Sequence, residues 1–221
     1  MSRPYSRPKS FVLRQGRITA SQKQGLEKHL PPIAIKDPNQ LNFKTIFLND
    51  APTVLEIGFG MGDALIQSAL NHPNLNFIGV EVHSPGVGHL AKSAYDHKIN
   101  NIRVFHGDVF QLLTQAQKNL ALSRIHIFFP DPWPKKRHHK RRLIQNDFIE
   151  LVLPHLKCDG IIHVATDVVE YAESIHQCLQ CFATLEKIDA DPTFQRSSTK
   201  FEARGIGLNH TIEDMLYKKI H

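Results

Sequence analysis

Glycines occupy alternate positions in one short segment, Gly58-Phe59-Gly60-Met61-Gly62. The segment follows an apolar, β-rich run and precedes residues with helical spacing, which predicts a tight strand-to-helix turn whose backbone can approach a ligand closely. The spacing differs from the Gly-x-Gly-x-x-Gly of dinucleotide sites, and Asp63 stands in the last glycine slot, so a dehydrogenase is disfavoured. Glu56 and Asp63 flank the loop. Because a pyrophosphate needs a helix N-terminus without competing negative charge, this setting favours a cationic ligand.

S-adenosylmethionine fits that description, since it carries a sulfonium and an ammonium but no phosphate. Glu81 comes at the end of the next predicted strand, where a carboxylate can accept both hydroxyls of a ribose. Asp108 follows the third predicted strand, where it either accepts the adenine amino group or caps a helix. The residues predicted to bind this cofactor are Glu56, Gly58, Gly60, Gly62, Glu81 and Asp108.

A proline-rich loop, Pro130-Asp131-Pro132-Trp133, follows the fourth predicted strand. Its prolines restrict the backbone and so place Asp131 with little freedom. Trp133 either stacks on a splayed base or braces the loop, and the sequence leaves both open. Transfer of a methyl group to guanine N7 needs alignment and stabilisation of growing positive charge, but no base, because N7 carries an unprotonated lone pair. A fixed carboxylate such as Asp131 suits that task.

Positive charge is concentrated in two places. Residues 1–26 contain no Asp or Glu, and a second basic cluster follows the proline-rich loop; the net charge is +6. Such clusters are usually solvated surfaces, but the position of the second one beside a candidate active loop favours a nucleic acid partner. The residues predicted to touch RNA are Arg137, His138, His139, Lys140, Arg141 and Arg142.

Short apolar runs alternate with segments of helical spacing from residue 53 onward. This alternation predicts an α/β fold with a mostly parallel sheet covered by helices on both faces. The expected strands are 53–57, 76–82, 102–106, 124–129 and 160–166, with two more between 185 and 219. The expected helices are 63–71, 85–97, 109–119, 143–156 and 168–182, with a loop over 130–142. Residues 1–40 contain several prolines and are expected to form an irregular, partly disordered basic arm before a domain over 41–221.

The composition places the chain among ordinary globular proteins. Three cysteines do not make a disulfide framework, and the pair Cys178 and Cys181 is expected to be packed on a helix without a metal. The sequence shows neither an apolar run long enough for a bilayer nor a secretory signal, so we expect a cytoplasmic protein without a membrane partner. Both a monomer and a homodimer are compatible with it.

The sequence resembles the bacterial tRNA (guanine-N7)-methyltransferase family, often called TrmB. The resemblance covers roughly residues 45 to 221, and the proline-tryptophan loop and the segment around Thr199 are its most specific parts. The glycine loop is shared by many methyltransferases. The matching segments are residues 55–62, 79–82, 128–136, 165–167 and 199–205.

This resemblance implies a Rossmann-like class I methyltransferase fold of seven strands, S-adenosylmethionine as methyl donor, and the variable-loop guanosine of tRNA as substrate. It implies that Asp131 contacts the cofactor and is the presumed catalytic group. The residues implied to hold the target nucleotide are Lys135, Asp167, Thr199, Lys200, Phe201 and Glu202. Structural roles compete here: Asp167 is placed to cap a helix, and Thr199 and Glu202 have the spacing of a capping box.

Two other functions remain compatible with these residues. One is a class I methyltransferase with a different nucleic acid or a small molecule as substrate. The other is an RNA-binding protein that has lost catalysis, although the intact glycine loop, Glu81 and Asp131 speak against it.

Overall fold

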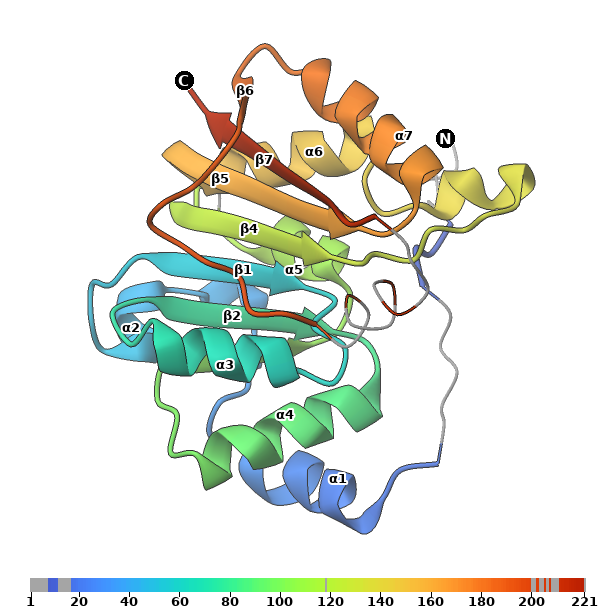
Figure 1. Cartoon of the computed structure of the whole chain (residues 1–221). Helices are drawn as coiled ribbons and strands as arrows, with labels where there is room; N and C mark the ends of the chain where they lie inside the picture. The colour runs from blue at the N-terminus through green and yellow to red at the C-terminus, as the bar shows by residue number, and fades with distance from the viewer. Residues whose placement is uncertain are drawn as a thin grey trace, which may run out of the picture.

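The computed structural model describes residues 8–11, 17–117, 119–199, 202, 205, 207 and 211–220. Their strands form a seven-stranded sheet in the order β3-β2-β1-β4-β5-β7-β6 (Figure 1). β7 is antiparallel to both of its neighbours, and the other paired strands run parallel. The strands are β1 (Thr53–Ile57), β2 (Asn76–Glu81), β3 (Ile102–His106), β4 (Leu122–Phe128), β5 (Leu156–Thr166), β6 (Leu185–Ile188) and β7 (Glu213–Lys219). The predicted Rossmann-like fold is confirmed.

Helices connect the parallel strands. The main ones are α3 (Asp63–Asn71), α4 (Ser84–Asp96), α5 (Val109–Gln115), α6 (Asn146–Val152) and α7 (Val169–Gln180). Shorter elements are α1 (Ala20–Gln24), η1 (Gly25–His29), η2 (Pro38–Gln40), α2 (Phe43–Phe47), η3 (Lys136–Arg141) and η4 (Leu153–His155). The basic segment expected to be all loop therefore contains a short helix, η3. The helix expected over 143–156 is shorter, because Pro154 ends α6 in the tighter turn η4.

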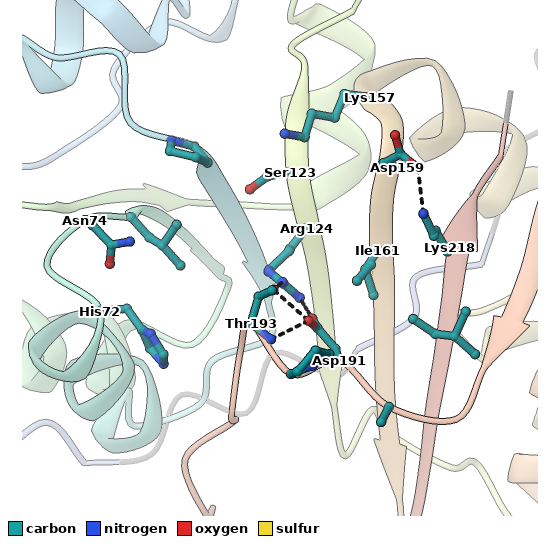
Figure 2. Close-up of a pocket in the computed structure, with 15 residues that line it drawn as sticks. His72, Asn74, Ser123, Arg124, Lys157, Asp159, Ile161, Asp191, Thr193 and Lys218 are labelled. Atoms are coloured by element: carbon teal, nitrogen blue, oxygen red, sulfur yellow. Dashed lines mark hydrogen bonds and ion pairs between the residues drawn. The ribbon is translucent and has the colours of Figure 1, made fainter.

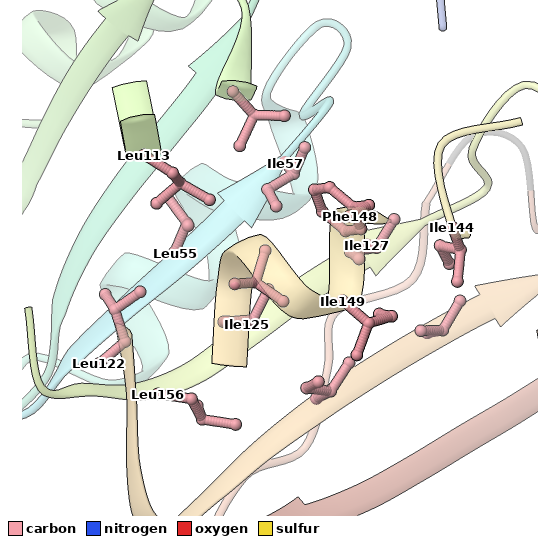
Figure 3. Packing of buried hydrophobic residues seen from close by; sticks show 14 of the residues in the cluster. Leu55, Ile57, Leu113, Leu122, Ile125, Ile127, Ile144, Phe148, Ile149 and Leu156 are labelled. Atoms are coloured by element: carbon pink, nitrogen blue, oxygen red, sulfur yellow. The ribbon is translucent and has the colours of Figure 1, made fainter. Parts of the chain in front are cut away.

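Two apolar layers enclose the sheet. Every residue of β1 and β2 is buried, as a sheet covered on both faces requires. Leu55 and Ile57 pack toward the side of α5, α6 and α7, whereas Val54 packs toward α3 and α4. Figure 3 shows Phe148 and Ile149 of α6 against the first of these layers. The alternation of side chains along each strand thus sets which residues face each helical layer.

The expectation of an irregular N-terminal region is wrong for part of it. α1 and η1 form a continuous helical stretch that lies along α4 (Figure 1). The ring of His29 stacks on Tyr95 of α4 at 4.1 Å between centroids. Ala34 then pairs with Val104 of β3 as an isolated bridge. Residues 20–35 are therefore packed on the domain, because their apolar side chains find a partner surface that sequence periodicity does not reveal.

The helices of the described residues include none that is long and apolar enough to cross a membrane.

Candidate active site

A cavity of about 360 Å³ opens at the carboxyl ends of β1, β2, β3 and β4. Ligands bind at this edge in open α/β sheets. Of the seven predicted cofactor residues, five line the cavity; among the described residues, Glu56 and Gly62 are outside its lining. The five are Gly58, Gly60, Glu81, Asp108 and Asp131. Residues from four separate strand ends are thus brought around one space.

The glycine loop leaves room for a ligand on its cavity side. Gly58 has a φ of 75°, which favours glycine, and a Cβ at this position would meet no described heavy atom within 4 Å. On the other side, α4 touches the loop so closely that a Cβ on Gly86 would come within 1.9 Å of the Gly60 carbonyl oxygen. α4 therefore supports the loop from behind while its front stays open.

Glu81 holds the loop in this shape. Its Oε2 accepts a hydrogen bond from the Gly60 N–H at 2.8 Å, and its Oε1 accepts from Val82 and His83 at 2.7 and 2.9 Å. The side chain is buried, with 9% of the residue exposed. Since a carboxylate offers about four acceptor positions, these three bonds leave one for a ribose hydroxyl. Glu81 thus braces the glycine loop and also lines the cavity.

Asp108 has the capping role, one of the two alternatives that the sequence left open. It is the N-cap of α5, where its Oδ1 accepts a hydrogen bond from the Phe110 N–H at 3.0 Å. It also lines the cavity. Capping fixes the carboxylate at the rim and leaves its remaining acceptor positions available to a ligand.

Glu56 is a buried carboxyl near the carboxyl end of β1. Only 4% of the residue is exposed, and its Oε2 has no hydrogen-bond partner in the described part of the chain. Burial raises the pKa of Glu56 to about 8. An uncompensated acceptor at this place suits a cationic group, which supplies the missing partner and stabilises the charged form.

The raised pKa of Glu56 makes stability depend on pH in the cofactor-free protein. Between the ordinary value of 4.5 and about 8, the folded state binds more protons than the unfolded state. The free energy of unfolding is therefore expected to fall as pH rises through this range, by up to about 1.4 kcal/mol per pH unit. Denaturant unfolding at several pH values will measure this slope. Glu56→Gln should flatten it, and equal slopes in both proteins would contradict the assignment.

The loop that carries Asp131 contains two strained residues. Phe129 and Trp133 adopt φ angles of 52° and 45°, in a region that bulky side chains rarely occupy. The Phe129 N–H donates to the Ala165 carbonyl of β5 at 2.7 Å, which fixes the start of the loop. Strain of this kind costs about 1–3 kcal/mol per residue and persists where the surroundings enforce it. The loop is therefore held in one shape on either side of Asp131.

Asp131 lies exposed at the cavity rim. Partial enclosure by the loop raises the pKa of Asp131 above its ordinary value, and the positive charge of Arg141 opposes this rise. Arg141 thus favours the ionised form of the carboxyl that faces the cavity.

Trp133 braces the loop in this structure. Its Nε1 donates to the Ser10 carbonyl at 3.0 Å, and the Arg141 guanidinium lies 4.1 Å from the ring centroid. Arg141 donates in turn to the carbonyls of Lys9 and Phe11. Ser10 and Phe11 also line the cavity. An N-terminal segment therefore forms one wall of the site, which the sequence did not predict because nothing in its composition links it to the distant loop.

The predicted RNA-binding residues divide into two groups. Arg137 and Lys140 are exposed, and His138 and His139 are half-buried. Arg142 differs, because only 5% of it is exposed and its Nε donates to the Pro132 carbonyl at 2.9 Å. Its guanidinium also lies 4.8 Å from the centroid of the Tyr171 ring. Arg142 is thus an internal support of the proline-rich loop and not part of the exposed basic surface of η3.

The segment predicted to hold the target nucleotide is partly described. Thr199 and Glu202 form a reciprocal capping box: each backbone N–H donates to the other's side chain, at 3.3 and 3.1 Å. Lys200 and Phe201 lie outside the described residues. Val168 is the N-cap of α7, so Asp167 does not have the predicted capping position. Asp167 lies instead beside Gly205, where a Cβ would come 3.4 Å from its Oδ2.

Lys135 immediately precedes η3 and is exposed. Among the described residues, neither Lys135 nor Asp167 nor Thr199 lines the cavity. The described residues predicted to hold the nucleotide are therefore not part of the cavity lining.

A larger hollow of about 580 Å³ lies at the opposite, amino ends of β1, β4 and β5. Figure 2 shows Arg124 within it, paired with Asp191 and hydrogen-bonded to Thr193. Lys218 is paired with Asp159 in the same hollow, at 2.7 Å. These internal ion pairs satisfy its charges, whereas the smaller cavity presents open acceptors.

Comparison with known proteins adds to this geometry. A family model described as "Putative methyltransferase" matches residues 50–215. A tRNA (guanine-N(7)-)-methyltransferase of Shewanella amazonensis is 43% identical over 218 residues, covering 96% of this chain and 92% of the relative. The chain belongs to the tRNA (guanine-N7)-methyltransferase family. A second member, from Shewanella putrefaciens, is 44% identical with the same coverage.

Solved structures agree on the fold. An rRNA methylase from Streptococcus thermophilus superposes with a TM-score of 0.54 at 14% identity, covering 85% of this chain and 99% of that chain. The 16S rRNA (adenine(1408)-N(1))-methyltransferase from Catenulisporales acidiphilia gives 0.55 at 11% identity, with 84% and 92% coverage. At such low identity these likenesses concern the fold alone, which is that of class I methyltransferases.

Proposed function

We propose that this protein transfers a methyl group from S-adenosylmethionine to N7 of guanine 46 in the variable loop of tRNA. One observation carries the proposal: Gly58, Glu81 and Asp131 face a single cavity at the carboxyl edge of the sheet, with the basic helix η3 beside it. The family to which the chain belongs supports the choice of guanine and tRNA.

The described residues fit the methyl donor. Gly58 leaves open space for a close approach, and Glu56 lacks a hydrogen-bond partner within the described chain. When bound, S-adenosylmethionine supplies a methyl group on a positively charged sulfur. Glu81 keeps the glycine loop in place, and Asp108 offers acceptor positions at the rim. Both acids act on binding and orientation.

Asp131 acts on the nucleophile, which is N7 of guanine. N7 attacks through a lone pair that carries no proton, so the protein has to align the purine and favour the positive charge that grows on it. An ionised Asp131 at the cavity rim does both when it accepts a hydrogen bond from the guanine edge. Its strained loop keeps the carboxylate in place before the RNA arrives, so little reorganisation is needed.

The exposed face of η3 supplies the attraction for RNA. Lys136, Arg137 and Lys140 are exposed there, and phosphate contacts by such residues give affinity that falls with salt. We therefore propose that these side chains hold the tRNA backbone while Arg142 supports the loop from inside.

Neutralising Lys136, Arg137 and Lys140 together to Gln should weaken tRNA binding and flatten its salt dependence. Each lost phosphate contact is expected to reduce the slope of log K against log salt by about 0.7–0.9. Binding titrations at several salt concentrations will measure it. Lys44→Gln is a matched control, since Lys44 is exposed on α2 and paired with Asp50. An unchanged slope in the triple variant would place the RNA on another surface.

The function itself is tested by incubating the protein with S-adenosylmethionine and total tRNA, followed by nucleoside analysis. 7-Methylguanosine is the expected product. A tRNA transcript with adenine in place of guanine 46 should remain unmethylated. A different methylated nucleoside, or methylation of the altered transcript, would reject the proposed substrate atom or position.

A further inference from the structure

Arg196 lies in the irregular segment between β6 and the capping box, and no motif in the sequence points to it. Its side chain is only 10% exposed. Three parts of the site meet around its guanidinium: Glu202 of the predicted nucleotide-binding segment, Asp214 of β7, and the ring of Phe128. Phe128 lines the cavity and begins the loop that carries Asp131.

The guanidinium joins these parts with two pairs of hydrogen bonds. Toward Glu202, Nη1 donates to Oε2 at 2.8 Å and Nη2 donates to Oε1 at 2.6 Å. Toward Asp214, Nε donates to Oδ1 at 2.8 Å and Nη2 donates to Oδ2 at 2.6 Å. Only the planar fork of arginine presents donors for two carboxylates in this way. The ring of Phe128 lies 5.7 Å from the same guanidinium.

Asp214 is itself fixed from the sheet. Its Oδ1 lies 2.7 Å from Nε2 of His163, a buried residue of β5. Hydrogen bonds from Arg196 lower the pKa of Glu202. Burial favours a higher pKa for Asp214, but hydrogen bonds from His163 and Arg196 lower it overall. Both carboxylates are thus ionised at neutral pH, and without the cation they would repel each other.

Arg196 also acts on Thr199 through Glu202. Oε2 of Glu202 accepts from Nη1 of Arg196 and from the Thr199 N–H, and Oγ1 of Thr199 accepts from the Glu202 N–H. Both oxygens of Glu202 are therefore engaged by Arg196, so the orientation of the whole capping box depends on this contact.

We propose that Arg196 is a positioning residue for the target guanosine: it holds Thr199 and Glu202 on β7, beside the Phe128 ring at the start of the Asp131 loop, without touching the nucleotide. This inference rests on the proposed function. A displacement of about 1 Å in a reacting group can reduce the rate by about a hundredfold, so loss of this anchor should impair the use of tRNA.

Two substitutions test the role of Arg196. Arg196→Met removes the charge and the donors, whereas Arg196→Lys keeps the charge but cannot make both bidentate contacts. We expect Arg196→Met to lower kcat/KM for tRNA by about ten- to a hundredfold, with a smaller loss for Arg196→Lys. The dissociation constant of S-adenosylmethionine, measured by calorimetry, should stay within about twofold, because the cofactor loop is held by Glu81 instead. Lys218→Met is the control, since Lys218 lies on β7, the strand that Arg196 contacts through Asp214, and pairs with Asp159 away from this segment.

A double-mutant cycle separates positioning from a general structural role. If Arg196 acts through the capping box, Thr199→Ala should cost much less in the Arg196→Met background than in the wild type. Additive losses would overturn the proposal, as would unchanged kinetics in Arg196→Met. If thermal melting shows that Arg196→Met is unfolded, the same cycle is run with Arg196→Lys. A wild-type protein that binds S-adenosylmethionine but does not methylate tRNA would instead reject the proposed function.

Discussion

Asp131→Ala is expected to reduce the rate of tRNA methylation by a factor of about 10²–10³ while S-adenosylmethionine and tRNA still bind. The carboxylate lies at the rim of the cavity, exposed and without a buried structural contact to lose among the described residues. Its loop is held independently, by the Phe129 N–H on β5 and by Arg142 on the Pro132 carbonyl. Removing the carboxylate should therefore leave the loop in place and remove only the alignment and the negative charge.

Two comparisons make the Asp131 result interpretable. Asp131→Asn keeps an acceptor of the same shape and loses the charge, so an intermediate loss would show that both hydrogen bonding and charge contribute. Single-turnover methylation measures the chemical step, and gel-shift and calorimetric titrations measure the two binding steps. Loss of both binding steps together with activity would indicate a folding defect, and wild-type turnover in Asp131→Ala would show that this carboxylate does not align the guanine.

The sequence predicted the sheet well because its signals are local. Residues 53–57 and 63–71 were placed at their observed ends, since a buried strand, a glycine turn and a helix succeed one another without interruption. Periodicity fixes such elements wherever one face is buried. The segment that forms β7 also shows helical spacing of apolar residues when it is considered alone. It is a strand because it pairs with β5 on one side and β6 on the other.

The prediction that the candidate cofactor residues lie at one site has a similar basis. Glu81 and Asp108 each follow a predicted strand, and the carboxyl ends of parallel strands share one edge. The sequence also offers the capping role of Asp108, but not the bracing role of Glu81. Glu81 holds three backbone N–H groups, which depends on the path of the glycine loop in space.

Contacts between distant segments account for what the sequence missed. Arg142 stands in a run of basic residues that looks like a uniform RNA surface, yet Tyr171 and Pro132 enclose it. Ser10 reaches Trp133 across more than a hundred residues of sequence. Arg196 has no motif, because its importance lies in the two acids that the fold brings to it. Charge pattern alone does not distinguish an exposed arginine from one that the tertiary structure buries.

The largest effect on cofactor binding is expected from Glu81→Ala. Removing this side chain leaves the N–H groups of Gly60, Val82 and His83 without their acceptor in a partly buried place. Hydrogen bonds to a charged group contribute about 1.5–3 kcal/mol each, so the loss of three is enough to release the loop from its open shape. Calorimetric titration with S-adenosylmethionine should show at least a hundredfold weaker binding.

Glu81→Gln separates the bracing role from a simple ligand contact. Its amide oxygen can replace one carboxylate oxygen, but its NH₂ group cannot accept from the remaining backbone N–H groups. Glu81→Gln should therefore bind more weakly than the wild type and more tightly than Glu81→Ala, while Asp108→Asn, which keeps an acceptor for the Phe110 N–H, should lose much less. Hydrogen exchange gives the independent readout: the amide of Gly60 should exchange faster in Glu81→Ala even without cofactor. A brace acts on the loop before any ligand is bound. If the Gly60 amide of Glu81→Ala keeps its wild-type protection, Glu81 does not brace the loop and affects cofactor binding only by contacting the cofactor.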